Sequence, residues 1–224
     1  MKKFVCVLCS LLATTFNAYS YEVSPMYLDL EDTGRQSSGN YTIGNVEQKT
    51  IAVEVSAFKV EYKDGEEVLT PAEDEFLILP PQAQIPSAAI QNFRVKFIPK
   101  SPLSTTAVYR IVFSQLDLDA DKESDGSTVN MLIDISTIAF VSPSNGKPEP
   151  KVSLADNKIQ VENKGNRILD MYDLAFDIKT DSGNKTFFWR DLNEDSGSWL
   201  MPGSKAQFKV PTNVNKATQI SLAQ

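Results

Sequence analysis

Histidine is absent from the 224 residues of this chain, and its two cysteines, Cys6 and Cys9, both lie near the amino terminus. Without an imidazole, Ser-His-Asp and Cys-His catalysis are excluded, and a zinc site is disfavoured. Beyond Cys9 the chain has no thiol, so the remainder folds without a disulfide. The composition therefore favours a non-enzymatic protein that needs no cofactor and is held together by packing.

The first twenty residues have the composition of a secretory signal peptide. Two lysines precede an apolar stretch from Phe4 to Phe16, and Ala18-Tyr19-Ser20 is a small-x-small cleavage site. The apolar stretch is shorter than the ~20 residues that a membrane-spanning helix needs. We therefore expect residues 1–20 to be cleaved, Tyr21 to begin the mature protein, and the protein to be exported without membrane insertion.

The charge of the chain is acidic. It has 22 basic and 29 acidic residues, and loss of the two signal lysines would change the net charge from −7 to −9. A field of this sign disfavours nucleic acid and anionic lipid as partners. The acidic run from Asp117 to Gly126 spaces its carboxylates like a calcium loop, but Lys122 and Thr128 stand where that loop needs Gly and Glu. We therefore expect neither a nucleic-acid partner nor a metal ion.

Strand-like runs recur along the chain, and no convincing amphipathic helix interrupts them. Those before Pro143 are Val23–Leu30, Asn40–Gly44, Thr50–Tyr62, Phe76–Leu79, Phe93–Ile98, Ala107–Leu116 and Val129–Val141. Asp64-Gly65 marks a hairpin turn, because such turns need positive φ. Seven strands at this spacing predict an immunoglobulin-like β-sandwich over residues 21–143.

A second set of strands follows a polar, proline-rich segment. We interpret that segment, residues 144–150, as an interdomain linker. The strands expected after it are Lys151–Leu154, Lys158–Asn163, Ile168–Lys179, Lys185–Trp189 and Lys205–Val210. The sequence thus predicts an all-β protein with a second β-domain over residues 151–224.

The strand from Val129 to Val141 carries the candidate binding residues. In its first part Val129, Met131, Ile133 and Ile135 share one face, and polar residues share the other. From Ile138 onward the strand is apolar on both faces, which predicts a buried end. Two interpretations of the apolar face stay open. It can face the core of its own domain, or it can be offered as a strand to another protein, although proteins normally avoid exposed apolar edges.

Three further segments are similar to one known family. They are Leu79-Pro80-Pro81-Gln82-Ala83-Gln84-Ile85-Pro86, Asn92-Phe93-Arg94-Val95 and Val108-Tyr109-Arg110-Ile111-Val112-Phe113. Together with the strand that ends at Pro143, they resemble the periplasmic chaperones of the chaperone–usher pathway of pilus and fimbrial assembly. The resemblance covers residues 23–143 and is weaker in the second half of the chain.

The resemblance implies two immunoglobulin-like domains set at an angle like a boomerang, in the periplasm. Chaperones of this family stabilise pilus subunits, which lack a final strand, by donating a strand of their own, and deliver them to an outer-membrane usher. Counted back from Pro143, the donor positions of the family fall on Val129, Met131 and Ile133, and Ile135 continues the same face. Self-association of the free protein is left open.

One feature of the family is missing from this sequence. The family holds the terminal carboxylate of the subunit between an arginine and a lysine, whose positions are here Tyr27 and Ile138. A buried carboxylate needs hydrogen-bond donors. Either Tyr27 with backbone N–H groups replaces the basic pair, or subunits are anchored differently, or the chain has another role. Arg94 and Arg110 are expected to pair with acidic neighbours.

An exported structural or adhesion β-protein, such as a surface subunit, is the alternative function. A subunit is expected to carry an alternating apolar extension at its mature amino terminus. The segment from Tyr21 to Leu30 alternates only partly and leads straight into the domain. The second β-domain also suits a chaperone better than a subunit.

Overall fold

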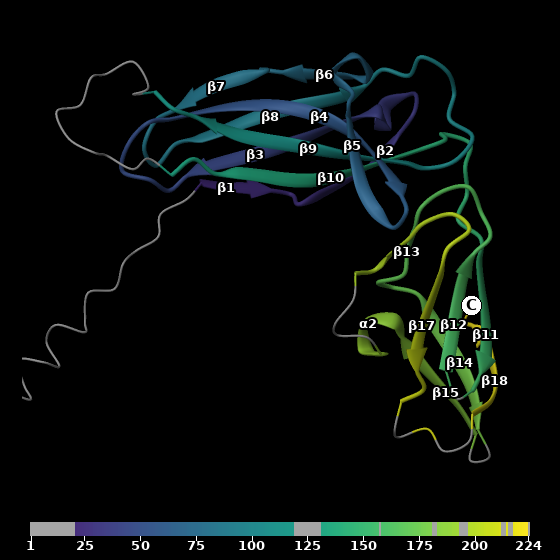
Figure 1. The fold of residues 1–224 in the computed structure, drawn as a ribbon. Coiled ribbons are helices and arrows are strands. Elements are labelled where there is room, and N and C mark those ends of the chain that lie inside the picture. The colour runs from purple at the N-terminus through teal and green to yellow at the C-terminus, as the bar shows by residue number, and fades with distance from the viewer. Residues whose placement is uncertain are drawn as a thin grey trace, which may run out of the picture.

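The computed structural model describes residues 21–118, 131–156, 158–180, 183–192, 197–211, 214 and 217–223. They form two stacks of β-sheets, which meet at a steep angle in Figure 1. The predicted all-β class is confirmed. The predicted signal peptide and Val129 lie outside the described residues. Within those residues no helix is both long enough and apolar enough to cross a membrane.

Two sheets pack face to face in the first half of the chain. One sheet has the strand order β1-β3-β8-β6, and the other has the order β2-β10-β9-β4-β5, with β7 also beside β4. The strands are β1 (Tyr21–Ser24), β2 (Tyr27–Glu31), β3 (Ser38–Asn45), β4 (Ile51–Lys63), β5 (Glu66–Pro71), β6 (Phe76–Leu79), β7 (Gln82–Ile85), β8 (Ile90–Phe97), β9 (Ala107–Leu116) and β10 (Asp134–Ser142). Two short 3-10 turns, η1 (Arg35–Ser37) and η2 (Glu73–Glu75), lie before β3 and β6.

Alternation along these strands places one face of each sheet in a shared core. Tyr41, Phe93 and Phe113 are fully buried there. The ring of Phe113 meets those of Tyr41 and Phe93 edge to face, at centroid distances of 5.2 Å and 5.9 Å. Such pairs contribute roughly 0.5–1.5 kcal/mol beyond the burial of their area. Aromatic packing thus stabilises residues 21–143, which contain no cysteine.

The second half contains three smaller sheets around a core of its own. Their strand orders are β11-β12-β17, β13-β16 and β15-β14-β18. The elements are β11 (Pro150–Ala155), β12 (Lys158–Asn163), β13 (Leu169–Asp170), β14 (Ala175–Thr180), β15 (Gly183–Phe188), α2 (Trp189–Leu192), β16 (Trp199–Leu200), β17 (Lys205–Lys209) and β18 (Ala217–Leu222). Ile159, Val161, Phe176 and Ile178 are buried at the centre of this core.

Several predicted elements need correction. The strand predicted over Val23–Leu30 is two strands in different sheets, because Pro25 has no N–H to donate to a continuous ladder. The strand predicted over Ile168–Lys179 is divided into β13 and β14 by a turn. The last strand of the first half begins at Asp134, and residues 131–133 are not part of it. Strands β5, β7, β16 and β18 were not predicted, because they are short or mostly exposed and their sequences do not distinguish them from loops.

The predicted hairpin at Asp64-Gly65 is confirmed. Both residues have positive φ, 55° and 86°, and they join β4 to β5. Glycine tolerates this backbone conformation without steric cost, and aspartate is among the few other residues that adopt it readily. Local turn chemistry was therefore sufficient to place this connection.

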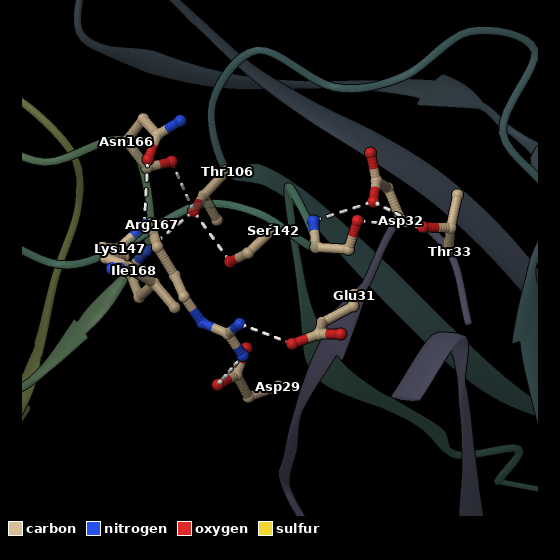
Figure 2. Close-up of polar contacts among 11 residues, drawn as sticks. Asp29, Glu31, Asp32, Thr33, Thr106, Ser142, Lys147, Asn166, Arg167 and Ile168 are labelled. Carbon is tan, nitrogen blue, oxygen red and sulfur yellow. Dashed lines mark hydrogen bonds and ion pairs between the residues drawn. The ribbon is translucent and has the colours of Figure 1, made fainter. Parts of the chain in front are cut away.

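A polar network joins the two halves, as Figure 2 shows. The Arg167 guanidinium donates hydrogen bonds to Glu31 at 2.7 Å and to Asp29 at 3.2 Å. The hydroxyl of Thr106 accepts one from the N–H of Ile168 at 2.8 Å. Because Asp29, Glu31 and Thr106 belong to the first half and the other two residues to the second, these bonds restrain the angle between the halves.

Asp32 restrains the start of the segment between the halves. Its buried carboxylate accepts hydrogen bonds from the N–H groups of Leu103 at 3.0 Å and Ser144 at 2.9 Å. Burial raises the pKa of Asp32, but these hydrogen bonds outweigh burial and hold the pKa below its usual range. The predicted linker, residues 144–150, therefore begins at a position that the first half holds in place.

Candidate functional site

One edge of the β2-β10-β9-β4-β5 sheet is partly open. Strand β10 pairs with β9 from Asp134 to Val141, but β2 covers only residues 138–142 of its other side. Before Tyr27 the chain turns at Pro25, and β1 joins the opposite sheet beside β3. Among the described residues, no strand therefore pairs with the side of β10 opposite β9 from Asp134 to Thr137.

The backbone of this open edge is available for pairing. The N–H of Gln115 donates to the carbonyl of Ile133 at 3.1 Å, so Ile133 bonds toward β9. Hydrogen-bonded residues alternate in an antiparallel ladder, so Ile135 also bonds toward β9. The N–H and C=O groups of Asp134 and Ser136 then point away from β9. A further strand can pair with the sheet at these two residues.

The predicted apolar residues flank the open edge. Met131 is 80% exposed and precedes β10. Ile133 and Ile135 are half-buried and pack against the core of the first half, whereas Asp134 and Ser136 are exposed. The two isoleucines thus stand at the border between the core and the solvent. Met131 continues the same alternation beyond the core.

Tyr21 ties the start of this edge to the core, a role that the sequence analysis missed. Its side chain is buried, and its hydroxyl lies 2.5 Å from the carbonyl oxygen of Phe113 and 3.0 Å from that of Ile133. Burial raises the pKa of Tyr21 to about 12, so the hydroxyl stays protonated and donates. Burial of Tyr21 and Val23 alternates with exposure in β1, and this period of two was the available sequence signal.

Tyr27 and Ile138, the two positions that the resemblance matches to a basic pair, come together in the structure. Tyr27 and Ile138 are direct partners in the parallel ladder of β2 and β10. Tyr27 is 49% exposed, and its ring packs against Trp199 of the second half at a centroid distance of 5.1 Å. No residue in the described part of the chain forms a hydrogen bond with the Tyr27 hydroxyl. Trp199 also packs on Phe140, which explains why this end of β10 is apolar on both faces.

Arg110 lies in the same row across the sheet. Its cross-strand partners are Ile138 on one side and Phe58 on the other. The guanidinium donates two hydrogen bonds to Glu67, at 3.0 Å and 2.9 Å, so the expected acidic partner of Arg110 is confirmed. Arg94, in β8 of the other sheet, has no acidic partner among the residues that the structure describes.

The fold of this chain is similar to that of several proteins of known structure. No family pattern and no curated protein matches the chain in sequence. The class 5 fimbriae chaperone CfaA is similar with a TM-score of 0.60 at 15% identity, over 92% of each chain. The E. coli chaperone DraB has a TM-score of 0.54 at 14% identity, over 87% of this chain and 88% of its own. The chain has the fold of these chaperones.

A chain from the complex of Salmonella enterica SafA pilin with the SafB chaperone is also similar. Its TM-score is 0.53 at 14% identity, over 88% of this chain and 87% of that one. These matches cover most of the length of each chain, so the likeness extends over both halves and the junction between them. At such low identity it concerns the fold alone, and the role of each residue has to be argued from this chain.

Proposed function

We propose that this chain is a periplasmic, non-enzymatic chaperone, which stabilises pilus subunits by donating a strand and delivers them to an outer-membrane usher. The observation that carries the proposal is the open edge of β10 from Asp134 to Thr137, with partly exposed apolar side chains beside it. The fold shared with CfaA and DraB supports the same role. No cofactor is required, since strand pairing needs none.

In this mechanism the subunit adds a strand to the free side of β10. Its main chain pairs with Asp134 and Ser136, and Val129, Met131, Ile133 and Ile135 enter its apolar groove. Full burial of such a side chain contributes roughly 1.5–3 kcal/mol before the cost of ordering both partners. The half-buried isoleucines have less surface left to bury than Met131, so Met131 has the largest potential contribution among the described residues.

Tyr27 is the proposed anchor for the terminal carboxylate of the subunit. It stands where β2 begins to cover β10, so a chain that follows the open edge reaches it next. Its hydroxyl can donate to a carboxylate, and Trp199 holds its ring. Arg110 lies in the same row, but its guanidinium is occupied by Glu67.

The proposal includes an arrangement of the whole chain. Residues 1–20 are a cleavable signal, and residues 21–143 and 151–224 are the two domains, joined by residues 144–150. Separate core clusters in the two halves support this division. When no subunit is bound, a second copy can cover the same edge, which would give the free protein a route to self-association.

Substitution of Ser136 tests the proposal through the backbone. Ser136 is exposed, and its N–H points to the open side, so Ser136→Pro removes an edge donor without removing a bond to β9. We expect co-expressed pilus subunits from the source genome to be degraded with Ser136→Pro but protected by wild type and by the matched control Ser136→Ala. Equal thermal melts would establish that all three fold. Wild-type protection by Ser136→Pro, or no protection by the wild-type chain, would contradict the proposal.

A further inference from the structure

The outer face of the β11-β12-β17 sheet, in the second half, carries a group of lysines. Side chains alternate along these strands, so Ile159, Val161 and Phe208 face the core and the residues beside them face outward. The registers of the sheet arrange the outward residues in three rows across the strands, which are Lys151-Glu162-Lys205, Ser153-Gln160-Gln207 and Ala155-Lys158-Lys209, with Lys164 just after β12. We call these ten residues the lysine face.

The lysine face has a surplus of positive charge. Its five lysines are all exposed, and Glu162 is its one acidic residue. The ammonium group of Lys164 lies 2.6 Å from the Glu162 carboxylate, and that of Lys205 lies 3.8 Å from it. The hydrogen bond and charge of the first lysine, with the charges of Lys205 and Lys151, hold the pKa of this carboxyl below its usual range. A single ionised carboxylate is therefore shared by three cations.

The acidic charge of the chain is concentrated in its first half. Residues 21–143 contain nine basic and nineteen acidic residues, whereas residues 144–224 contain eleven basic and ten acidic residues. Glu149 and Asp156 flank the two ends of β11, and the lysines still outnumber the acids when both are counted with the face. At physiological ionic strength charges act over only about 8 Å, so a ligand on the lysine face responds mainly to the face itself. The net charge of the whole chain is therefore a poor guide to what this face binds.

The chemistry of the face favours a flat anionic surface as its partner. None of its ten residues is aromatic or a large aliphatic residue. Protein interfaces are usually centred on such residues and are depleted of lysine. Single-stranded nucleic acids are held by aromatic stacking, and the bases of a duplex are most often read by arginine, which the face also lacks. Lysine binds phosphate as a point charge, which is sufficient for a plane of lipid headgroups.

We propose that the lysine face binds reversibly to a membrane surface that contains anionic phospholipids. The ammonium groups of the two outer rows pair with headgroup phosphates. The amides of Gln160 and Gln207, in the middle row, donate hydrogen bonds to the same headgroups. Because the face has no large apolar side chain to insert, the protein lies on the lipid surface and is released by salt.

The lysine face and the open edge of β10 share no residue. The face belongs to the second half of the chain, and the open edge belongs to the first. If the proposed function is right, a chaperone bound to the membrane surface therefore keeps its donor residues free of direct lipid contact by the face. Membrane binding by the lysine face does not itself depend on strand donation.

Co-sedimentation with lipid vesicles tests the proposal. The mature chain is mixed with vesicles of phosphatidylcholine alone, or with vesicles in which about one third of the lipid is anionic phosphatidylglycerol. We expect binding to the anionic vesicles alone, and its loss at roughly 0.5 M salt, where the Debye length falls to about 4 Å. Equal binding to both kinds of vesicle, or no binding to the anionic ones, would overturn the proposal.

Two variants with opposite expected effects locate the binding on the face. Lys158 and Lys209 are cross-strand neighbours without an acidic partner in the described part of the chain. Each lysine near an anionic surface contributes about fivefold, so Lys158→Glu with Lys209→Glu should weaken binding by about 25-fold or more. Glu162→Gln removes the one acid of the face and should strengthen binding several-fold. Unchanged binding in both variants would contradict the assignment of the face.

A charge-matched variant is the control for net charge. Arg94 and Lys96 are exposed in β8 of the first half, and their replacement by Glu changes the net charge equally. This variant should bind the anionic vesicles like wild type, and thermal melts of all variants should agree. Equal loss of binding in both double variants would overturn the proposal, because the total charge would then be responsible.

Two other occupants of the face are outcomes of the same experiments. A short DNA duplex might compete with the vesicles only if it binds the same lysines; tighter binding to the duplex than to the vesicles, lost in the Lys158→Glu, Lys209→Glu variant, would make nucleic acid the partner. A dimer in sedimentation velocity that this variant dissociates would show that the face binds the acidic first half of a second copy. Either result would overturn the membrane proposal.

Subunit protection separates this inference from the proposed function. The Lys158→Glu, Lys209→Glu variant should protect a co-expressed subunit as well as wild type does. If the wild-type chain binds anionic vesicles through the lysine face but protects no subunit, the proposed function fails and the membrane-binding face stands. If subunits are protected but anionic vesicles are not bound, the membrane-binding face fails alone.

Discussion

Replacement of Met131 by Asp should weaken subunit binding without destabilising the free protein. Met131 is 80% exposed, precedes β10 and is not part of the core of the first half. Substitutions at such positions usually change the free energy of unfolding by no more than about 0.5 kcal/mol. Any large effect on subunit binding would therefore arise in the complex.

The expected loss follows from the surface that Met131 has left to bury. Full burial of a methionine contributes about 1.5–3 kcal/mol, and four fifths of that is about 1.2–2.4 kcal/mol. An unpaired carboxylate in the apolar groove of the subunit adds a penalty of roughly 1–3 kcal/mol. The two terms together give about 2.2–5.4 kcal/mol. Since 1.4 kcal/mol corresponds to a tenfold change, the affinity should fall by roughly 10²- to 10⁴-fold.

Ile133→Asp is a less selective perturbation. Ile133 packs against the core in the free protein, so a carboxylate there should lower the free energy of unfolding as well as the affinity. The comparison of Met131→Asp with Ile133→Asp therefore separates binding from stability. Met131→Leu is the conservative control and should bind like wild type.

The assay measures subunit protection and stability on the same variants. Co-expressed subunits are followed by proteolysis in periplasmic extracts and by pull-down, and each purified variant is unfolded in urea. Wild-type affinity for Met131→Asp would remove this residue from the donated strand. Loss of folding in the same variant would refute the reasoning in another way, because an 80% exposed residue should not be required by the core.

Three further predictions concern other parts of the site. Tyr21→Phe removes the hydroxyl that hydrogen-bonds to the carbonyls of Phe113 and Ile133. The free energy of unfolding should therefore fall by about 1–2 kcal/mol, and amide hydrogens near Ile133 should exchange faster. Unchanged exchange would show that these hydrogen bonds do not hold the segment in place. Tyr27→Phe should leave stability unchanged but weaken subunit capture, and equal pull-down yields would exclude its hydroxyl as the anchor. Hydrogen bonds hold the pKa of Asp32 below its usual range, although burial opposes them. The ionised Asp32 carboxylate therefore contributes its full stability above the unfolded pKa of about 3.9. That contribution is lost as the pH falls through the lower pKa of the folded protein. Thermal melts should therefore show that Asp32→Asn is less stable at neutral pH and that its disadvantage shrinks in acid, and a constant difference across pH would contradict this assignment.

Local signals predicted a large part of the first half. The bounds of β6 and β9 agree with the sequence prediction, and the Asp64-Gly65 turn lies where expected. These features depend on period-two alternation and on turn residues, which neighbouring positions in the chain determine. The alternation of Ile133 and Ile135 against Asp134 was likewise readable in advance.

The open edge could not be predicted in the same way. It exists because β1 and β2 enter different sheets and β2 covers only one end of β10. Alternation reports that one face of a strand is apolar, but not which strand lies beside it. Pairing of Tyr27 with Ile138 joins distant parts of the chain, and only the tertiary structure decides such contacts.

The sequence by itself determined the all-β class, the lack of stabilising disulfides beyond Cys9 and the apolar face before Pro143. These follow from composition and from a two-residue period, which are local properties. The tertiary structure decided that Ile133 and Ile135 stand at the border of the core, that Tyr21 holds this segment, and that Trp199 supports Tyr27. Each of these depends on residues brought together by sheet pairing and by the junction of the two halves.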